Sequence, residues 1–223
     1  MQKFDTPAPV TVVVHIPAGR LQVIAADRTD TIVEVRPANP TKSRDVKAAE
    51  QITVEYGDGV LRVDAPAAKN QYFGPSGSVE VTVQLPTGSR VEGKAASAEL
   101  RGVGRLGDVS FEGAHGTVKI DEAAGARLTV LAGDVLIGRL GGPAEISTLK
   151  GDIRIAEAVR GTVVLTTQMG DVSVDAARGV SASLDAGTGY GRIHNALKNA
   201  DGAAAGLNIR ATTSHGDITA RSL

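Results

Sequence analysis

Apolar and polar residues alternate along most of the chain in short runs, with turn-forming residues between the runs. Val163 and Leu165 lie on one side of such a run, and Val172 and Val174 lie on the inner side of the next, with Ser173 facing outward. A period of two residues is typical of a β-strand with one buried face. The pattern therefore predicts an all-β protein.

The first 86 residues contain alternating runs of unequal length and spacing. Residues 56–59, Tyr-Gly-Asp-Gly, predict a tight hairpin turn between two of these runs. Residues 43–51 predict one or two helical turns, and residues 69–77, with Tyr72 and Phe73, predict a loop. We expect residues 1–86 to form an irregular N-terminal β layer. Its expected strands are 10–16, 21–25, 31–36, 52–56, 60–63 and 78–85.

From residue 87 onward, a motif of the form T-x-x-G-D-[IV]-x-[IV] repeats. Its glycines and a second glycine series together recur about every nine residues, so that a full unit has 18 to 19 residues. Two weaker copies place Thr117 and Tyr190 where the others have aspartate. The clear copies are VLAGDVLI at 130–137, TLKGDIRI at 148–155, TQMGDVSV at 167–174 and TSHGDITA at 213–220.

This spacing predicts a β-solenoid. Nine residues accommodate a strand of about five residues and a turn of about four. Strands of one direction that recur in every full unit are typical of coils that stack on one another. Residues 87–223 therefore predict about seven coils. Residues 1–86 would cap them within one continuous body, because an open solenoid end needs a cap. Residues 196–205 predict a protruding loop.

The repeated glycine and aspartate have a structural explanation. The glycine stands where the chain leaves a strand and needs a positive φ. The aspartate that follows can accept N–H groups of the turn. A row of stacked carboxylates could instead bind Ca²⁺, but Ca²⁺-binding rolls need G-G-x-G-x-D turns, and Thr117 and Tyr190 interrupt the row. We therefore predict turn aspartates and no metal site. The turn aspartates are Asp108, Asp134, Asp152, Asp171 and Asp217.

The composition excludes several classes of function. The chain of 223 residues has a formal net charge of -1, which gives no electrostatic basis for binding nucleic acid. Cysteine and tryptophan are absent, and only three Phe and three Tyr are present, so thiol chemistry and aromatic stacking platforms have little support. No signal peptide and no apolar run of about 18 residues is found, which predicts a cytoplasmic protein without a membrane span.

The polar residues give no catalytic constellation. His115 and His215 occupy the position before the turn glycine, where other copies have Ala132, Lys150 and Met169, so a metal pair is not expected. No nucleophile and base stand at a recognisable spacing. Three positively charged side chains align on the outer face of the strand that follows the Gly-Asp pair. We favour a solvated surface there over an anion-binding site. These cations are Lys119, Arg154 and Arg192.

One part of the solenoid combines an aromatic residue, a kink and a long loop. Gly191 stands where the other copies have a branched apolar residue, and marks either a bulge or a small void filled by a neighbour. Tyr190 precedes it, and Lys198 and Asn199 lie in the adjacent insertion. If the solenoid has a specific contact surface, we expect it at Tyr190, Gly191, Lys198 and Asn199.

The repeat resembles that of a known family. Together with the element Leu85-Pro86-Thr87-Gly88-Ser89 before it, the motif is similar to the bacterial putative-adhesin family, also called the toastrack domain. The resemblance covers nearly the whole chain. It implies a β-solenoid-like fold and a role in sensing or ligand binding at the cell envelope. It implies no enzymatic activity, catalytic residue or cofactor.

Three functions follow in order of preference. The first is a non-catalytic binding or scaffold module for a protein or envelope-associated partner. The second is a self-assembling structural protein, with a homo-oligomer formed through the open solenoid end. The third is a polysaccharide-active β-helix enzyme, which the scarcity of aromatic residues and carboxylate clusters disfavours.

Overall fold

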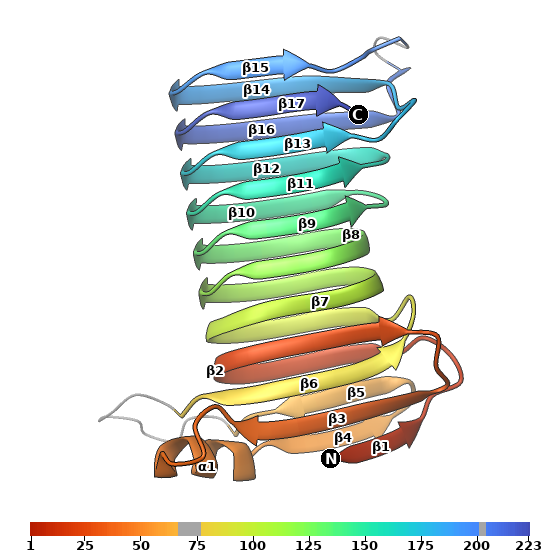
Figure 1. The fold of residues 1–223 in the computed structure, drawn as a ribbon, viewed down its shortest axis with the longest axis vertical. Helices are drawn as coiled ribbons and strands as arrows, with labels where there is room; N and C mark the ends of the chain where they lie inside the picture. The colour runs from red at the N-terminus through yellow and green to blue at the C-terminus, as the bar shows by residue number, and fades with distance from the viewer. Residues whose placement is uncertain (67–76, 201–203) are drawn as a thin grey trace.

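The computed structural model describes residues 1–66, 77–200 and 204–223. These residues form one continuous sheet of seventeen strands and one short helix (Figure 1). The fold is therefore all-β. The N-terminal elements are β1 (Gln2–Asp5), β2 (Thr11–Ala26), β3 (Asp30–Pro37), α1 (Ser43–Glu50), β4 (Thr53–Gly57), β5 (Val60–Asp64) and β6 (Val79–Pro86). The later strands are β7 (Arg90–His115), β8 (Val118–Ala132), β9 (Val135–Leu140), β10 (Ala144–Lys150), β11 (Ile153–Ala158), β12 (Gly161–Met169), β13 (Val172–Ala176), β14 (Ala182–Tyr190), β15 (Ile193–Ala196), β16 (Leu207–His215) and β17 (Ile218–Ser222).

The strands from β7 onward wind into a solenoid with two faces. One coil is one circuit of the chain, with a strand on each face. Val118 pairs with Val135, Val135 with Ile153, and Ile153 with Val172, all in parallel strands. All four side chains are buried. The inward column that the alternating pattern predicts is therefore confirmed.

Aliphatic side chains fill the space between the two faces. Leu128, Ile146 and Leu165 form a column on the first face, and Ile137 and Ile155 lie in a column on the second. All five are buried within one continuous apolar cluster. β-Branched and aliphatic residues suit this pleated, half-buried surface.

The last coil in sequence is not the last coil in space. β16 pairs in parallel with β12 on one side and with β14 on the other, and β17 lies in the same way between β13 and β15. Figure 1 shows β14 and β15 at the end of the stack, with β16 and β17 beneath them. Simple stacking in sequence order, which the repeat predicted, is wrong at this point.

Burial gives a physical reason for this insertion. The inward residues Leu207, Ile209 and Ile218 of the inserted coil are fully buried, so this coil gains from a neighbour on both sides. The coil made of β14 and β15 has a more polar inward set. Its Asn195 occupies the column of Ala220, and Ile193 is 46% exposed. Placing the more polar coil at the end buries more apolar surface overall.

The boundary at residue 86 does not separate a cap from the solenoid. β2 pairs in parallel with β7 on one side and with β5 and β6 on the other, so it belongs to the parallel stack. The strands β1, β3 and β4 lie beyond it and pair antiparallel with their neighbours. The predicted cap therefore consists of these three strands and α1, rather than of all residues 1–86.

Local features of the N-terminal part follow the sequence. Asp58 and Gly59 both have positive φ, 52° and 75°, and join β4 to β5 in the predicted hairpin. The buried Asp45 of α1 accepts the backbone N–H of Ser78 at 3.0 Å, which fixes the helix beside β6. The predicted loop at 69–77, with Tyr72 and Phe73, falls almost wholly outside the described residues. Within the described ranges, no helix is long and apolar enough to cross a membrane.

Candidate functional site

The repeated aspartates form a ladder of hydrogen bonds between coils. The N–H of Asp152 donates to the carboxylate of Asp134 at 2.9 Å, that of Asp171 to Asp152 at 2.8 Å, and that of Asp217 to Asp171 at 2.7 Å. The ladder ends where the N–H of Arg192 donates to Asp217 at 2.8 Å. This N–H is the main reason why the pKa of Asp217 lies below its ordinary value. Each carboxylate therefore holds the turn of the next coil.

The threonine and glycine of the motif also act between coils. The hydroxyls of Thr167, Thr213 and Thr188 donate at 3.0 to 3.1 Å to the carbonyl oxygen of the turn glycine in the neighbouring coil. The glycine of the motif has a φ between +134° and +154° at Gly116, Gly133, Gly151, Gly170, Gly191 and Gly216. A Cβ at Gly151 would collide with the carbonyl oxygen of Gly133. The motif therefore encodes the packing of one coil on the next.

The aspartate ladder offers little to a cation. One oxygen of each carboxylate, Oδ1, already accepts a backbone N–H group of the next coil. Among residues 1–66, 77–200 and 204–223, no group of three or more His, Cys, Asp or Glu side chains could hold a metal ion.

Two of the aspartate assignments change in the structure. Asp108 lies opposite Gly125 at the other edge of the solenoid, where it forms an ion pair with Arg90 at 3.0 Å. It is not part of the ladder, because its glycine belongs to the second glycine series. Tyr190 lies opposite His215, in the column before the turn glycine, and not in the aspartate column. Arg192 occupies the aspartate position of that coil.

Gly191 is a turn glycine, and it marks neither a bulge nor a void filled by a neighbouring side chain. Its φ is +154°, and a Cβ there would collide with the carbonyl oxygen of Gly216. The sequence contains both Gly189 and Gly191, and the prediction that Tyr190 stands in the aspartate position requires the turn to be at Gly189. The segment Gly191-Arg192-Ile193 fits the motif with one substitution. Arg192 consequently leaves the predicted row of outer cations, where His194 takes its place next to Thr219.

The predicted contact residues are not brought together. Tyr190 is the last residue of β14 and Gly191 follows it, whereas Lys198 and Asn199 contact the beginning of this strand. The carbonyl of Lys198 accepts the N–H of Ala182, and the side chain of Asn199 accepts the Ser181 hydroxyl. A strand of this length spans about 26 Å, so the four residues do not form one patch. Tyr190 is 74% exposed and stacks on His215 with ring centroids 5.0 Å apart.

The two ends of the solenoid differ in how they close the core. At the N-terminal end, the rings of Phe4 on β1 and Tyr56 on β4 meet with centroids 5.4 Å apart, and the antiparallel strands lie outside the stack. At the other end, the inward residues Leu184 and Ala186 are only half-buried, and Ile193 is largely exposed. In the described structure, β14 and β15 each have one strand neighbour. The second end is therefore open.

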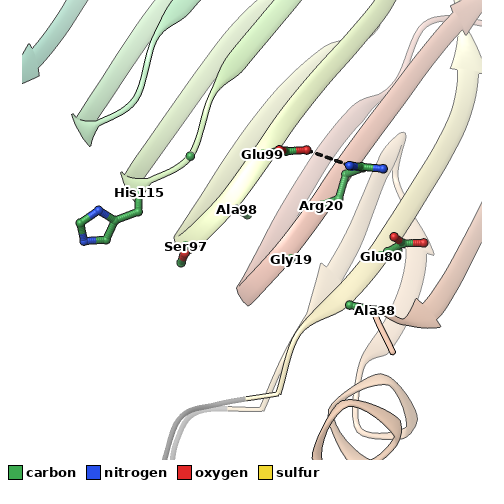
Figure 2. A pocket seen from close by; sticks show the side chains of 9 residues that line it. Gly19, Arg20, Ala38, Glu80, Ser97, Ala98, Glu99 and His115 are labelled. Atoms are coloured by element: carbon green, nitrogen blue, oxygen red, sulfur yellow. Dashed lines mark hydrogen bonds and ion pairs between the residues drawn. The ribbon is translucent and has the colours of Figure 1, made fainter. Parts of the chain in front are cut away.

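A small hollow lies beside the glycine edge near the N-terminal end. It has a volume of about 290 Å³. Arg20 and Glu99 form an ion pair at 3.0 Å across neighbouring strands, and the ring of His115 points away from them (Figure 2). Both charged groups are about half exposed, so the pair is solvated and worth little energy. This arrangement has no group poised for proton transfer.

A larger groove of about 620 Å³ follows the opposite edge of the solenoid. Its floor consists of glycine and alanine residues from successive turns, including Gly107, Ala124 and Gly142. The exposed Arg105 and Arg160 line it, and the Nε of Arg160 donates to the carbonyl of Gly141 at 3.1 Å. Sequence reasoning missed this groove, although the second glycine series marks its floor.

A family model described as Toastrack DUF4097 matches residues 8–221. No curated protein matches the chain. Three solved structures match this chain, and each match covers 98% of this chain and 95% of the other. They are a "putative adhesin" from Parabacteroides distasonis (16% identity, TM-score 0.47), a "putative adhesin" from Bacteroides fragilis (12% identity, TM-score 0.45) and a "putative lipid binding protein" from Parabacteroides distasonis (11% identity, TM-score 0.45). Likeness of this degree has no bearing on function. The family match spans nearly the whole chain, which therefore belongs to the Toastrack DUF4097 family.

Proposed function

We propose that the protein is a non-catalytic binding or scaffold module whose partner is a protein or an envelope-associated molecule. The observation that carries this proposal is the groove along the solenoid edge. It extends across successive coils, and most of the residues that line it are glycine or alanine. A surface of this shape suits an extended chain better than it suits a small substrate, which proteins usually enclose.

The charges of the groove favour an acidic ligand. Arg105 and Arg160 contribute two guanidinium groups. The one carboxylate of the lining, Glu122, lies 3.7 Å from Arg139 on the neighbouring coil, which also binds Glu157 at 2.7 Å and so offsets the charge of Glu122 only in part. Guanidinium groups bind carboxylates through paired hydrogen bonds. We therefore propose that an extended segment rich in carboxylates lies along this edge.

A peptide of eight glutamates, labelled with a fluorophore, tests the proposal. We expect its anisotropy to rise with protein concentration, and Arg105→Ala together with Arg160→Ala to weaken binding at least tenfold. Arg154→Ala is the matched control, because Arg154 is equally exposed but does not line the groove. Equal binding by the groove variant and the control would contradict the proposed site. Absence of binding at low salt would contradict the preference for acidic chains.

A specific observation also supports the second candidate, self-assembly. Among the described residues, β14 and β15 at the open end each have a single strand neighbour, and a strand edge of this kind is a template for further strands. The N-terminal end carries the antiparallel strands and α1, so a second copy cannot continue the parallel coils there. Any assembly through the open end would therefore be limited in size rather than an endless stack.

A further inference from the structure

We propose that the groove selects its ligand by sequence, and that Glu122 is the residue that sets this preference. The preferred chain is extended, has carboxylates at two positions four residues apart, and has a basic residue midway between them. The preference rests on the proposed binding of an acidic chain along the groove. It adds to that function the spacing and the signs of the charges that the groove accepts.

The two arginines of the groove lie three coils apart. Arg105 pairs in register with Glu122 of the next coil, and Glu122 with Arg139 of the coil after that. Arg160 stands one coil further on, where its Nε donates to the carbonyl of Gly141 at 3.1 Å. Coils repeat about every 4.8 Å, so the backbones at Arg105 and Arg160 are separated by about 14 Å along the groove.

An extended chain matches this separation over four residues. Extended residues advance about 3.3 Å each, so four of them cover about 13 Å, and the side chains of alternate residues point to the same side. The first, third and fifth residues of such a chain therefore face the groove together. When the first carboxylate lies at Arg105, the fifth residue brings a second carboxylate to Arg160.

Both groove arginines are exposed, and the carboxylates near them are held by other arginines. These ion pairs are Asp108 with Arg90, Asp121 with Arg101 and Glu157 with Arg139, at 2.7 to 3.0 Å. A ligand therefore meets guanidinium groups that it does not have to detach from a neighbouring carboxylate. Such groups bind a carboxylate through charge-assisted hydrogen bonds.

Glu122 faces the middle residue of the bound chain. It lies one coil beyond Arg105, about 5 Å along the groove, and the third residue of the ligand lies about 7 Å along it. The Glu122 side chain is 37% exposed, and its contact with Arg139 at 3.7 Å is longer than the contact of Arg139 with Glu157 at 2.7 Å. Glu122 therefore retains negative charge, which attracts a basic third residue and repels a carboxylate there.

The charged groups of the lining thus have the order positive, negative, positive along the groove. The other residues that line it are glycine, alanine, leucine and proline, which add no opposing charge. The complementary chain has the order acidic, basic, acidic at alternate residues. The groove therefore favours a mixed pattern over an unbroken run of carboxylates.

Three peptides that differ at the middle position test this preference. Their sequences are GSESKSESG, GSESSSESG and GSESESESG, with both ends blocked. Each is titrated into ¹⁵N-labelled protein at low salt, and amide chemical shifts give the dissociation constant. We expect affinity to fall in that order by about two- to fivefold at each step, the range for exposed charge pairs. The negative charge of the peptide rises in the same order, so a surface that attracts anions without selection gives the reverse ranking.

The spacing is tested with a fourth peptide, GSSEESSSG, which has the composition of GSESSSESG. Its adjacent carboxylates point to opposite sides of an extended chain, so only one of them faces the groove. We expect it to bind about two- to fivefold more weakly than GSESSSESG. Equal affinities would contradict the spacing of four residues.

Glu122→Gln tests the residue that selects the ligand, because it removes the charge and keeps the shape of the side chain. The ranking of the three peptides should reverse in this variant and follow their negative charge. Glu145→Gln is the matched control: Glu145 contacts Arg127 of the neighbouring coil at 3.4 Å but does not line the groove. The control should keep the wild-type ranking. A wild-type ranking in Glu122→Gln would overturn the role of Glu122.

Failure of the preference and failure of the proposed function give different results. If neither these peptides nor the peptide of eight glutamates binds, the groove does not take acidic chains. If the peptide of eight glutamates binds but the wild type ranks the three peptides by negative charge, the groove takes acidic chains without selecting the middle residue. Amide shifts should centre on Gly107, Ala124 and Gly142, which line the groove. Shifts centred elsewhere would contradict both.

Discussion

Arg221 forms two hydrogen bonds of 2.8 Å with the carboxylate of Asp175, a residue 46 positions earlier in the chain. The Asp175 side chain is 7% exposed, and its hydrogen bonds raise the pKa of Arg221. The pair joins β17 to β13 and so fixes the last coil at its inserted position. A solenoid stacked in sequence order would separate these two residues by an additional coil.

Loss of this ion pair should destabilise the inserted coil. Arg221→Ala leaves the carboxylate of Asp175 buried without its partner, which is more costly than the loss of a solvated pair. We expect a clearly lower urea midpoint, measured by circular dichroism. Arg154→Ala removes an exposed arginine on the outer face, and should leave the urea midpoint equal to that of the wild type within experimental error. Equal midpoints for the two variants would show that the pair does not hold the coil.

The threonine column allows a test of the bonds between coils. The hydroxyl of Thr167 donates to the carbonyl of Gly151 at 3.1 Å, whereas the buried hydroxyl of Thr148 has no partner among the described residues. Val130 occupies the same column in the neighbouring coil, so valine fits there. We expect Thr167→Val to cost about 1 kcal/mol of unfolding free energy, and Thr148→Val to be neutral or stabilising. Urea denaturation of both variants measures the difference, and equal costs would contradict it.

The turn glycines should not tolerate a side chain. Gly151→Ala places a Cβ against the carbonyl of Gly133 at a φ of +143°, so the coils must separate or the turn must change. We expect a loss of about 3 kcal/mol or more. Gly187→Ala is the matched control, because a Cβ at Gly187 meets nothing within 4 Å. A similar thermal stability for the two alanine variants would show that close stacking of the turns is not required.

The sequence predicts the solenoid well because its two periods act independently. The alternation of Val172, Ser173 and Val174 defines the inner side of a strand, and the recurrence of glycine defines the length of a coil. Both are local properties, and the column from Val118 to Val172 follows from them. The glycines of the second series belong to the same corner of successive coils, so the groove that they line becomes visible only when the coils are stacked.

The order of the coils could not be predicted in this way. β14 and β16 both present alternating inward residues with the same spacing, so either could follow β12. The burial of their inward residues depends on which coil gains more from a neighbour on both sides. That gain depends on how Asn195 and Ile193 pack in three dimensions. The ambiguity between Gly189 and Gly191 has a similar origin. A shift of the turn by two residues, from Gly189 to Gly191, changes the column of Tyr190 but leaves the alternation of the strand unchanged.

Acid should weaken the N-terminal end through Asp30. Arg28 and Lys3 donate to its carboxylate and lower its pKa to about 2. The unfolded chain has an ordinary carboxyl pKa of about 3.9. The folded state therefore binds the proton less readily, and the stabilisation by Asp30 is complete above about pH 4 and is lost as the pH falls toward about 2.

Asp30→Asn removes this contribution, so the difference in urea midpoint between wild type and variant should be constant from pH 5 to 7 and should shrink below about pH 4. Lys3 on β1 and Asp30 on β3 join two cap strands, so hydrogen exchange in β1 should rise over the same range. A difference that persists unchanged at about pH 2 would mean that the asparagine acts through packing rather than through the lost charge.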